Sequence, residues 1–323
     1  MYIHLLSYSL LVSIAFWSIV AFSLHLLWPL FFLVYASLLF LLWYTIKIMK
    51  KFLKISRPRF WVYVAGPFWL SAAIFYPLGA HLSSILFFLF YFTFPANIFI
   101  YGVNDLYDRA TDMLNEKKNS YEQVLNKSDD KKLIYIILIS NLPFIIYGFM
   151  YLPTPAFVSL FVFMLLAWQY SAPPLRAKAK PFVDSLVSGF LYIVPVGVSY
   201  GICTNTYPPV VPMLAGFLWS YAMHLYSAVP DIEADKMANI QTGATLFGKN
   251  TTLYVCGALY SLSAFIAYFY IGYFAILAGL GYIYLIYISI RKHTSIDVLS
   301  VYKIFPFFNT VVGGIIFAIL LFS

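Results

Sequence analysis

Residues 5–46 read LLSYSLLVSIAFWSIVAFSLHLLWPLFFLVYASLLFLLWYTI, without a single Asp, Glu, Lys or Arg. One straight helix over this stretch would be roughly 60 Å long, about twice the thickness of the bilayer's hydrocarbon core. The stretch is therefore expected to form two membrane-spanning helices with a turn between His25 and Pro29. It lacks the basic start and the small-residue cleavage site of a secretory signal peptide.

The same apolar character extends through the chain of 323 residues, of which 63% are hydrophobic and 10% are charged. Soluble domains carry about 25% charged residues, so most side chains here do not face water. Further apolar segments are expected to span the membrane at Trp61–Leu78, Ile85–Val103, Leu133–Tyr151, Ala156–Tyr170, Phe182–Cys203, Val210–Val229, Thr252–Tyr270, Phe274–Ile290 and Ile304–Leu321. The sequence thus predicts an all-α integral membrane protein of about eleven transmembrane helices.

The distribution of the net charge of +8 argues against nucleic acid as a partner. If connections alternate between the two membrane sides, all 20 Lys and Arg and all 12 Asp and Glu fall on one side. The Lys and Arg lie in Lys47–Arg59, Arg109–Lys132, Arg176–Lys180, Lys236–Lys249 and Arg291–Lys303. The positive-inside rule assigns this side to the cytoplasm, together with the N-terminus and any active site. Basic loops there also attract anionic membrane lipid.

The first acidic cluster, Asn104–Asp112, reads NDLYDRATD at the cytoplasmic end of an expected helix. If the helix continues, Asp105, Asp108 and Asp112 share one face at i, i+3 and i+7. Like charges this close repel one another, so a cation is expected to neutralise them. Carboxylate oxygens suit Mg²⁺, which typically takes one or two carboxylates plus substrate phosphate oxygens.

The second acidic cluster reads DIEADK at residues 231–236. Asp231 and Asp235 share a helix face at i, i+4, whereas Glu233 points elsewhere. The two clusters end helices that lie four apart in the series, as a duplicated four-helix unit would produce. A solvated helix end is the simple alternative for either cluster alone, but two such clusters at equivalent places favour a metal site.

A basic turn, YSAPPLRAK at Tyr170–Lys178, lies between the two clusters. Pro173 and Pro174 stop the preceding helix and create an extended turn that carries Arg176 and Lys178. Arg binds phosphate through two parallel hydrogen bonds and Lys binds it as a point charge. The alternative role for Arg176 and Lys178 is to fix the orientation of the chain in the membrane through the positive-inside rule. Two acidic clusters with a basic turn between them predict a site for a metal-bound diphosphate.

Three other polar residues are candidates near this site. Tyr170 is expected to contact phosphate because it lies beside the basic turn. Asp184 is expected to pair with a cation of that turn or to cap its own helix, a structural role. His224 precedes Asp231 by seven residues, hence on about the same face of a continuous helix, and could accept a proton. A packed or hydrogen-bonded histidine is the interpretation that we favour.

These residues together resemble the UbiA superfamily of intramembrane prenyltransferases, over roughly Ser56 to the C-terminus. Three motifs carry the resemblance: NDxxDxxxD at Asn104, Asp105, Asp108 and Asp112; YxxPPxRxK at Tyr170, Pro173, Pro174, Arg176 and Lys178; and DxxxD at Asp231 and Asp235. The resemblance implies nine helices around a cavity open to lipid. It divides the chain into a prenyltransferase domain, residues 55–323, and an additional transmembrane hairpin, residues 1–54.

The resemblance also implies an alkyl-transfer enzyme that uses Mg²⁺, a prenyl diphosphate donor and a lipophilic acceptor. Mg²⁺ would connect the diphosphate to Asp105, Asp108 and Asp112 on one side and to Asp231 and Asp235 on the other. Asn104, Tyr170, Arg176 and Lys178 would contact the diphosphate. Charge withdrawal by the metal and by Lys178 would improve the leaving group, and aromatic faces would stabilise the allylic cation.

Within the superfamily, YSAPPLRAKAKPFVDS at residues 170–185 and VPDIEADK at residues 229–236 are most similar to the lycopene elongases. Thr242, Thr245 and Gly248 continue this similarity. The implied acceptor is a carotenoid, and an aromatic quinone precursor or another lipid is the alternative. Met113 and Asn239 depart from the family, which often has Arg and Gly there.

Three other classes of membrane protein compete with this interpretation. A CDP-alcohol phosphotransferase would need a DG…AR segment that the chain lacks. A transporter would place its carboxylates near the midplane on broken helices, not at helix ends. A non-catalytic partner subunit would not need the complete set of acids. The N-terminal helix pair is expected either to cover the cavity mouth or to bind a partner protein.

Overall fold

The computed structural model describes residues 52–107 and 130–322. The described chain contains helices and their connections but no strands, and Lys54–Ser323 forms one compact unit. Asp108 and Asp112 lie outside the described residues, as does the expected helix pair before residue 52. The all-helical prediction is confirmed.

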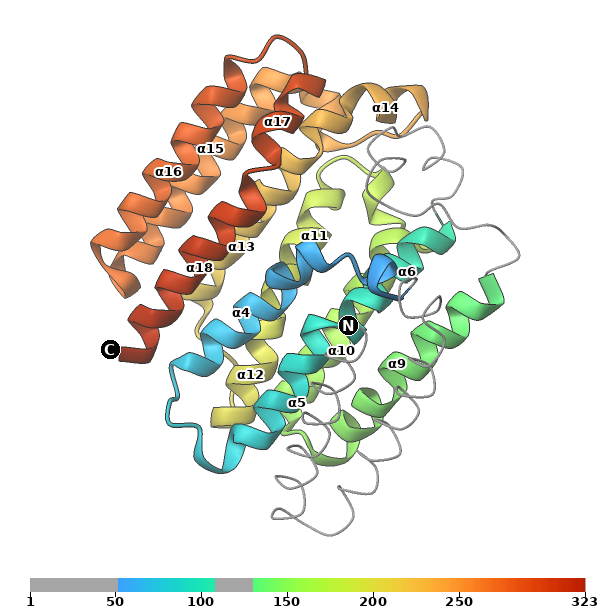
Figure 1. Ribbon diagram of the computed structural model, residues 1–323, viewed down its shortest axis with the longest axis vertical. Coiled ribbons are helices and arrows are strands. Elements are labelled where there is room, and N and C mark those ends of the chain that lie inside the picture. The colour runs from blue at the N-terminus through green and yellow to red at the C-terminus, as the bar shows by residue number, and fades with distance from the viewer. Residues whose placement is uncertain (1–51, 108–129, 323) are drawn as a thin grey trace, which may run out of the picture. The chain divides into compact units, whose positions relative to one another are not determined.

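The longer helices follow one another in an order that Figure 1 shows. They are α4 (Trp61–Ala73), α5 (Leu82–Thr93), α6 (Pro95–Tyr107), α9 (Asp130–Tyr151), α10 (Thr154–Ser171), α11 (Val183–Ile193), α12 (Pro195–Thr204), α13 (Val210–Ser227), α14 (Ile232–Met237), α15 (Gly243–Ile271), α16 (Tyr273–Ile290), α17 (Leu299–Tyr302) and α18 (Phe305–Phe322). Short 3-10 helices precede α4, α5, α11, α14 and α17, at η1 (Pro58–Phe60), η2 (Gly79–His81), η4 (Ala177–Ala179), η5 (Val229–Asp231) and η6 (Ile296–Val298).

Helical segments long and apolar enough to cross a bilayer number seven within the described residues. They are Gly79–Tyr107, Asp130–Tyr151, Thr154–Ser171, Val183–Thr204, Gly243–Ile271, Tyr273–Ile290 and Ile296–Phe322. The chain is therefore a multi-pass integral membrane protein. The total of eleven spans stays a prediction.

Two of these spans are divided by proline into a pair of helices, a break that was not expected. Helix α5 ends at Thr93 and α6 begins at Pro95, while α11 ends at Ile193 and α12 begins at Pro195. Proline has no N–H to donate to the preceding turn, and its ring crowds the carbonyl four residues back.

Small residues bring α10 and α12 into close contact. A Cβ added to Gly201 would lie 2.6 Å from the backbone nitrogen of Ala156, and one added to Gly197 would lie 2.5 Å from Oγ of Ser159. Such contacts let two membrane helices pack backbone to backbone. Helix α10, which carries the basic turn at its C-terminal end, is thereby held against α12.

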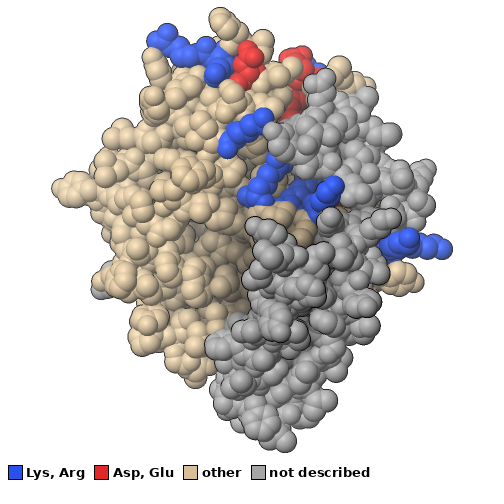
Figure 2. Space-filling view, viewed as in Figure 1, with Lys and Arg blue, Asp and Glu red and all other residues tan. Residues whose placement is uncertain are grey.

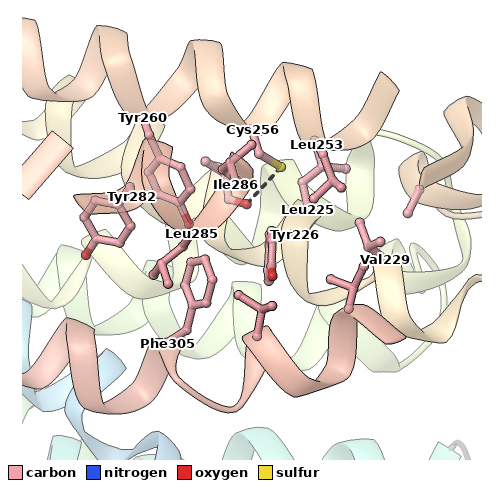
Figure 3. Close-up of a cluster of buried hydrophobic side chains, with 14 of the residues drawn as sticks. Leu225, Tyr226, Val229, Leu253, Cys256, Tyr260, Tyr282, Leu285, Ile286 and Phe305 are labelled. Atoms are coloured by element: carbon pink, nitrogen blue, oxygen red, sulfur yellow. Dashed lines mark hydrogen bonds between the residues drawn. The ribbon is translucent and has the colours of Figure 1, made fainter. Parts of the chain in front are cut away.

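A buried aromatic cluster joins α13, α15, α16 and α18 (Figure 3). Tyr226 stacks on Phe305 with 4.3 Å between ring centroids, and Tyr260 stacks on Tyr282 at 4.4 Å. The Cys256 thiol donates a 3.4 Å hydrogen bond to a backbone carbonyl of α13. This packing anchors the C-terminal half of α13, directly before the second acidic cluster.

Candidate active site

Charged side chains gather toward one end of the described bundle. On the face shown in Figure 2, the Lys, Arg, Asp and Glu side chains of the described residues lie between the upper end, where α14 and α17 lie in Figure 1, and about mid-height, and the described surface below carries uncharged residues. The C-terminal end of α6 points toward the same upper region. Asp105, at the end of α6, and the second acidic cluster therefore belong to the charged end of the bundle.

Asp105, in the last turn of α6, is only 8% exposed and is held by an arginine from a distant part of the chain. Arg57 Nη2 donates a hydrogen bond to Asp105 Oδ1 at 2.8 Å. The Arg57 guanidinium also lies over the ring of Tyr101, 4.5 Å from its centroid. Arg57 has a φ of 47°, in the left-handed region that side chains rarely occupy. This unusual backbone conformation, before Pro58, places the guanidinium at the first acidic cluster.

Two side-chain contacts connect the first acidic cluster to α13 through the end of α10. Asn104 Nδ2 donates to Oγ of Ser171 at 3.1 Å. The neighbouring Tyr170 hydroxyl lies 3.3 Å from Nε2 of His224, and the two rings meet edge to face. His224 is in the last turn of α13. Residues of the first acidic cluster and of the basic turn are thus linked, together with the separate candidate His224, through the C-terminal end of α10.

The basic turn has more structure than the extended turn that was expected. Helix α10 ends at Ser171, one residue later than predicted, and Ala172 is extended at φ −95° and ψ 155°. Arg176 then adopts left-handed angles, with φ 45° and ψ 57°, and η4 follows with Lys178 in its middle. The left-handed residue reverses the chain and presents Lys178 on a short helix.

The second acidic cluster lies on a helix of its own, separate from α13. Helix α13 ends at Ser227, and η5 intervenes because Pro230 cannot continue the α-helical hydrogen bonds. The expectation that His224 and Asp231 share a face of one continuous helix is therefore wrong. The relative position of His224 and Asp231 is therefore set by the η5 turn and not by helical periodicity.

Within the second cluster, the helical spacing of the two aspartates is retained. Asp231 is the N-cap of α14 and Asp235 follows one turn later. Glu233, between them, pairs instead with Lys236 at 3.5 Å, and both side chains are more than half exposed. Glu233 is therefore a natural control for experiments on the two aspartates.

Asp184 has a structural contact that differs from the two that were expected. Its side chain is 1% exposed, and Oδ2 accepts a 3.4 Å hydrogen bond from the backbone nitrogen of Gly243. Gly243 is the first residue of α15, where Thr242 and Thr245 form a capping box. Asp184 therefore ties the start of α11, just after the basic turn, to the start of α15.

Two residues after the second acidic cluster, Asn239 and Gly248, have a positive φ. Asn239 has a φ of 55°, a conformation that glycine and asparagine tolerate best. Asparagine thus fits a backbone conformation at a position where the resemblance implies glycine. Gly248, within α15, has a φ of 75° and marks a kink in that helix.

The described donor atoms suit a hard divalent cation. Asp105, Asp231 and Asp235 offer carboxylate oxygens, the ligands that Mg²⁺ prefers. Within residues 52–107 and 130–322, no three His, Cys, Asp or Glu side chains form a metal-binding group. Asp108 and Asp112, the two other predicted ligands, lie outside these ranges.

A large apolar cavity, of about 820 Å³, lies among α4, α12, α13, α15, α16 and α18. An aromatic series joins the first acidic cluster to this cavity: the ring of Tyr101 lies 5.6 Å from Phe60, which lies 5.8 Å from Tyr63 in the cavity wall. Gly313 and Gly314 line the cavity from α18, and a Cβ added to either would meet no atom within 4 Å.

The aromatic residues of this series could not be selected from the sequence. The chain has 28 Tyr and 32 Phe, and most aromatic residues in a membrane protein pack in the core or face lipid. Arg57 carried a weak signal, because it directly precedes a proline at the start of an expected helix. Its partner could not be predicted from a separation of 48 residues.

Comparisons with known proteins agree with this arrangement. Residues 59–298 match the model of the UbiA prenyltransferase family. The lycopene elongase/hydratase of Haloarcula japonica is 37% identical over 269 residues, covering 81% of this chain and 87% of the relative. The lycopene elongase/hydratase of Halobacterium salinarum is 38% identical over 263 residues, covering 80% and 92%.

Solved structures show the same fold at low sequence identity. A UbiA homologue from Archaeoglobus fulgidus, solved with DMAPP and Mg²⁺, has a TM-score of 0.63 and 17% identity, covering 84% of this chain and 99% of the homologue. Its complex with GPP and Mg²⁺ has a TM-score of 0.59 with the same coverage. With the matched family model and the two archaeal relatives, this shows that the chain is a membrane prenyltransferase and belongs to the UbiA prenyltransferase family.

Proposed function

We propose that this prenyltransferase transfers a prenyl group from a Mg²⁺-bound prenyl diphosphate to an acyclic carotenoid such as lycopene. The observation that carries the proposal is a charged site that ring contacts of Tyr101, Phe60 and Tyr63 connect to the wall of an apolar cavity of about 820 Å³. A diphosphate and a long hydrocarbon need these two environments side by side. The names of the relatives from Haloarcula japonica and Halobacterium salinarum support a carotenoid acceptor.

The acidic residues proposed to hold Mg²⁺ are Asp105, Asp108, Asp112, Asp231 and Asp235. When bound, the ion would neutralise the diphosphate and make it a better leaving group. The solved UbiA homologue that holds DMAPP with Mg²⁺ supports the use of a divalent ion. Arg57 orients Asp105 through the 2.8 Å hydrogen bond.

The basic turn is proposed to bind the diphosphate oxygens. Arg176 and Lys178 supply the positive charge, and Asn104 and Tyr170 supply hydrogen-bonding groups beside it. As the allylic C–O bond breaks, its electron pair leaves with the diphosphate. A double bond of the acceptor then supplies the electron pair of the new C–C bond. The rings of Phe60, Tyr63 and Tyr101 present faces that stabilise positive charge.

The position of the site in the cell is also part of the proposal. The positive-inside rule assigns the charged end of the bundle, and the N-terminus, to the cytoplasm. Soluble prenyl diphosphate would enter from that side, and the acceptor would enter from the bilayer. Residues 1–54 are proposed to form a separate transmembrane hairpin that covers the cavity mouth or binds a partner protein.

A transfer assay tests the proposal directly. The purified protein is incubated with radiolabelled dimethylallyl diphosphate, Mg²⁺ and lycopene, beside Asp235→Asn and the matched Glu233→Gln variant. We expect a labelled, longer carotenoid that falls at least about 100-fold in Asp235→Asn and stays within about twofold in Glu233→Gln. Transfer only to an aromatic or other lipid acceptor would contradict the carotenoid assignment. Equal losses in both variants would contradict the metal-site assignment.

A further inference from the structure

A directed chain of hydrogen bonds lies in the wall of the otherwise apolar cavity. Trp219, Tyr282, Asn309 and Tyr63 all line the cavity, and they come from four different helices. Trp219 Nε1 donates to the Tyr282 hydroxyl at 2.8 Å. The Tyr282 hydroxyl donates to Asn309 Oδ1 at 2.6 Å, and Asn309 Nδ2 donates to the Tyr63 hydroxyl at 3.1 Å.

The direction of this chain is fixed by chemistry at its first residue. An indole N–H can only donate a hydrogen bond, so the Tyr282 oxygen must accept from Trp219. The Tyr282 O–H must then donate its own proton to Asn309. The amide of Asn309 must then present its oxygen to Tyr282 and its nitrogen to Tyr63. The Tyr63 oxygen accepts the last hydrogen bond of this series, from Asn309. The Tyr63 O–H proton takes no part in the series.

That proton has no other acceptor in the described parts of the chain. Tyr63 is 4% exposed, and its one hydrogen bond within residues 52–107 and 130–322 is the one that it accepts from Asn309. Leaving a buried donor unused is unfavourable, by about 1–3 kcal/mol. Ser71, Ser263 and Thr310, which also line the cavity, instead donate to backbone carbonyls. The Tyr63 hydroxyl therefore differs from these hydroxyl groups of the wall.

Tyr63 lies between the proposed diphosphate site and the apolar cavity. Its ring contacts Phe60 and Tyr192 on the side of the diphosphate site, and Trp219 on the side of the cavity. Tyr63 thus stands where a hydrocarbon in the cavity would meet the allylic cation. A hydrocarbon acceptor has no oxygen, so the hydrogen-bond acceptor available there is water.

We propose that the Tyr63 hydroxyl, oriented by Trp219, Tyr282 and Asn309, holds the water molecule that ends the transfer reaction. The inference rests on the proposed function. Attack by the terminal double bond of the acceptor leaves a tertiary cation on the acceptor. The water oxygen adds to this cation, forming a C–O bond, and its surplus proton passes to the released diphosphate. The product is a tertiary alcohol, and Tyr63 acts as a positioning residue for the water.

Labelled water tests this role. The protein is incubated with lycopene, dimethylallyl diphosphate and Mg²⁺ in H₂¹⁸O, and the products are separated by mass. We expect an ¹⁸O-labelled alcohol from the unaltered protein. Tyr63→Phe is expected to lower the ratio of alcohol to alkene among the transfer products at least about tenfold. Asn309→Leu should act in the same direction because it removes the group that orients Tyr63, and Ser263→Ala, the matched control, should leave the ratio unchanged.

A second arm uses the donor without any acceptor. Capture of the allylic cation by water breaks the C–O bond and places ¹⁸O in the prenyl alcohol, whereas phosphatase cleavage places it in the phosphate. A labelled prenyl alcohol that depends on Tyr63 would support the water site even if lycopene were not accepted, in which case only the proposed acceptor fails. Unlabelled transfer products, or an unchanged alcohol ratio in Tyr63→Phe, would overturn the inference. A donor arm without Tyr63-dependent labelling, together with no transfer, would overturn both proposals.

Discussion

The guanidinium of Arg57 lies 2.8 Å from the carboxylate of Asp105, although 48 residues separate them in sequence. The pair is nearly buried, with side-chain exposures of 11% and 9%. A buried carboxylate that loses a cation paired with it is strongly destabilised, typically by about 3–5 kcal/mol. The ion pair therefore stabilises the bundle as well as orienting a proposed metal ligand.

Substitution of Arg57 by Gln is expected to lower the thermal unfolding temperature in detergent, by the equivalent of about 3 kcal/mol. Added Mg²⁺ should restore more stability to this variant than to the unaltered protein, because the ion would take over neutralisation of Asp105. Arg59→Gln is the matched control, since Arg59 lies over Phe60. Equal stabilisation by Mg²⁺ in all three proteins would contradict a metal role for Asp105.

Lys178→Ala is expected to raise the KM for the prenyl diphosphate about tenfold or more, because a charge-assisted contact to phosphate is lost. Lys180, two residues later and exposed, supplies the matched control, and Lys180→Ala should stay within about twofold. Initial rates over a range of donor concentrations, with pyrophosphate inhibition measured alongside, separate the two variants. An equal rise in KM in both variants would indicate that the turn attracts the diphosphate by its overall positive charge and not by a specific contact with Lys178.

Tyr170→Phe is expected to raise the donor KM about tenfold if its hydroxyl contacts phosphate, because a hydrogen bond to a charged group is lost. The hydroxyl also lies 3.3 Å from His224. The His224→Gln variant therefore measures how much of the change in KM comes from loss of the contact between Tyr170 and His224. Tyr107→Phe, at an exposed tyrosine next to Trp168, is the control. If Tyr170→Phe and His224→Gln change only unfolding temperature, and to the same extent, the phosphate contact is ruled out.

Asp184→Ala is expected to destabilise the protein by about 1–3 kcal/mol, because the backbone N–H of Gly243 loses its buried acceptor. Asp184→Asn retains a carbonyl oxygen and should recover part of this stability. Thermal unfolding of both variants, with turnover measured on the folded fraction, checks the assignment. An unfolding temperature unchanged in Asp184→Ala, combined with lost turnover, would show a direct role in the reaction.

Local spacing predicted the parts of the site that a single helix carries. Asp231 and Asp235 lie one turn apart because the carboxylate spacing and the helical repeat agree. The same method failed from His224 to Asp231, where Pro230 breaks the helix and periodicity no longer applies. Periodicity describes neighbours within one element only.

Contacts between distant elements needed the structure. The partner of Asp105 comes from before α4, and the backbone of Arg57 there has a φ of 47° that no propensity rule predicts. The chain from Trp219 to Tyr63 joins four helices and is made by common residue types. In a chain with so many aromatic residues, composition cannot identify the few whose hydroxyl groups are oriented by neighbours.

Gly314→Leu is expected to reduce turnover of a long carotenoid severalfold by filling part of the cavity, while the use of dimethylallyl diphosphate in the donor-only reaction stays unchanged. The new side chain meets no atom within 4 Å at its Cβ, so the unfolding temperature should not fall. Gly279→Leu is the contrasting variant, because a Cβ there would lie 2.6 Å from Ala264. A loss of stability in Gly314→Leu would show that α18 packs more tightly than its contacts indicate.

The open space beside Gly313 and Gly314 has an evolutionary consequence. In a packed bundle, most side chains can be replaced by a larger one only if a neighbour is replaced by a smaller one. A change of substrate therefore usually requires several coordinated mutations. Along this part of α18, single substitutions can add one methyl or methylene group at a time without disturbing the charged end of the bundle. Selection can therefore adjust the size of the accepted lipid in small steps while the metal- and diphosphate-binding groups stay the same.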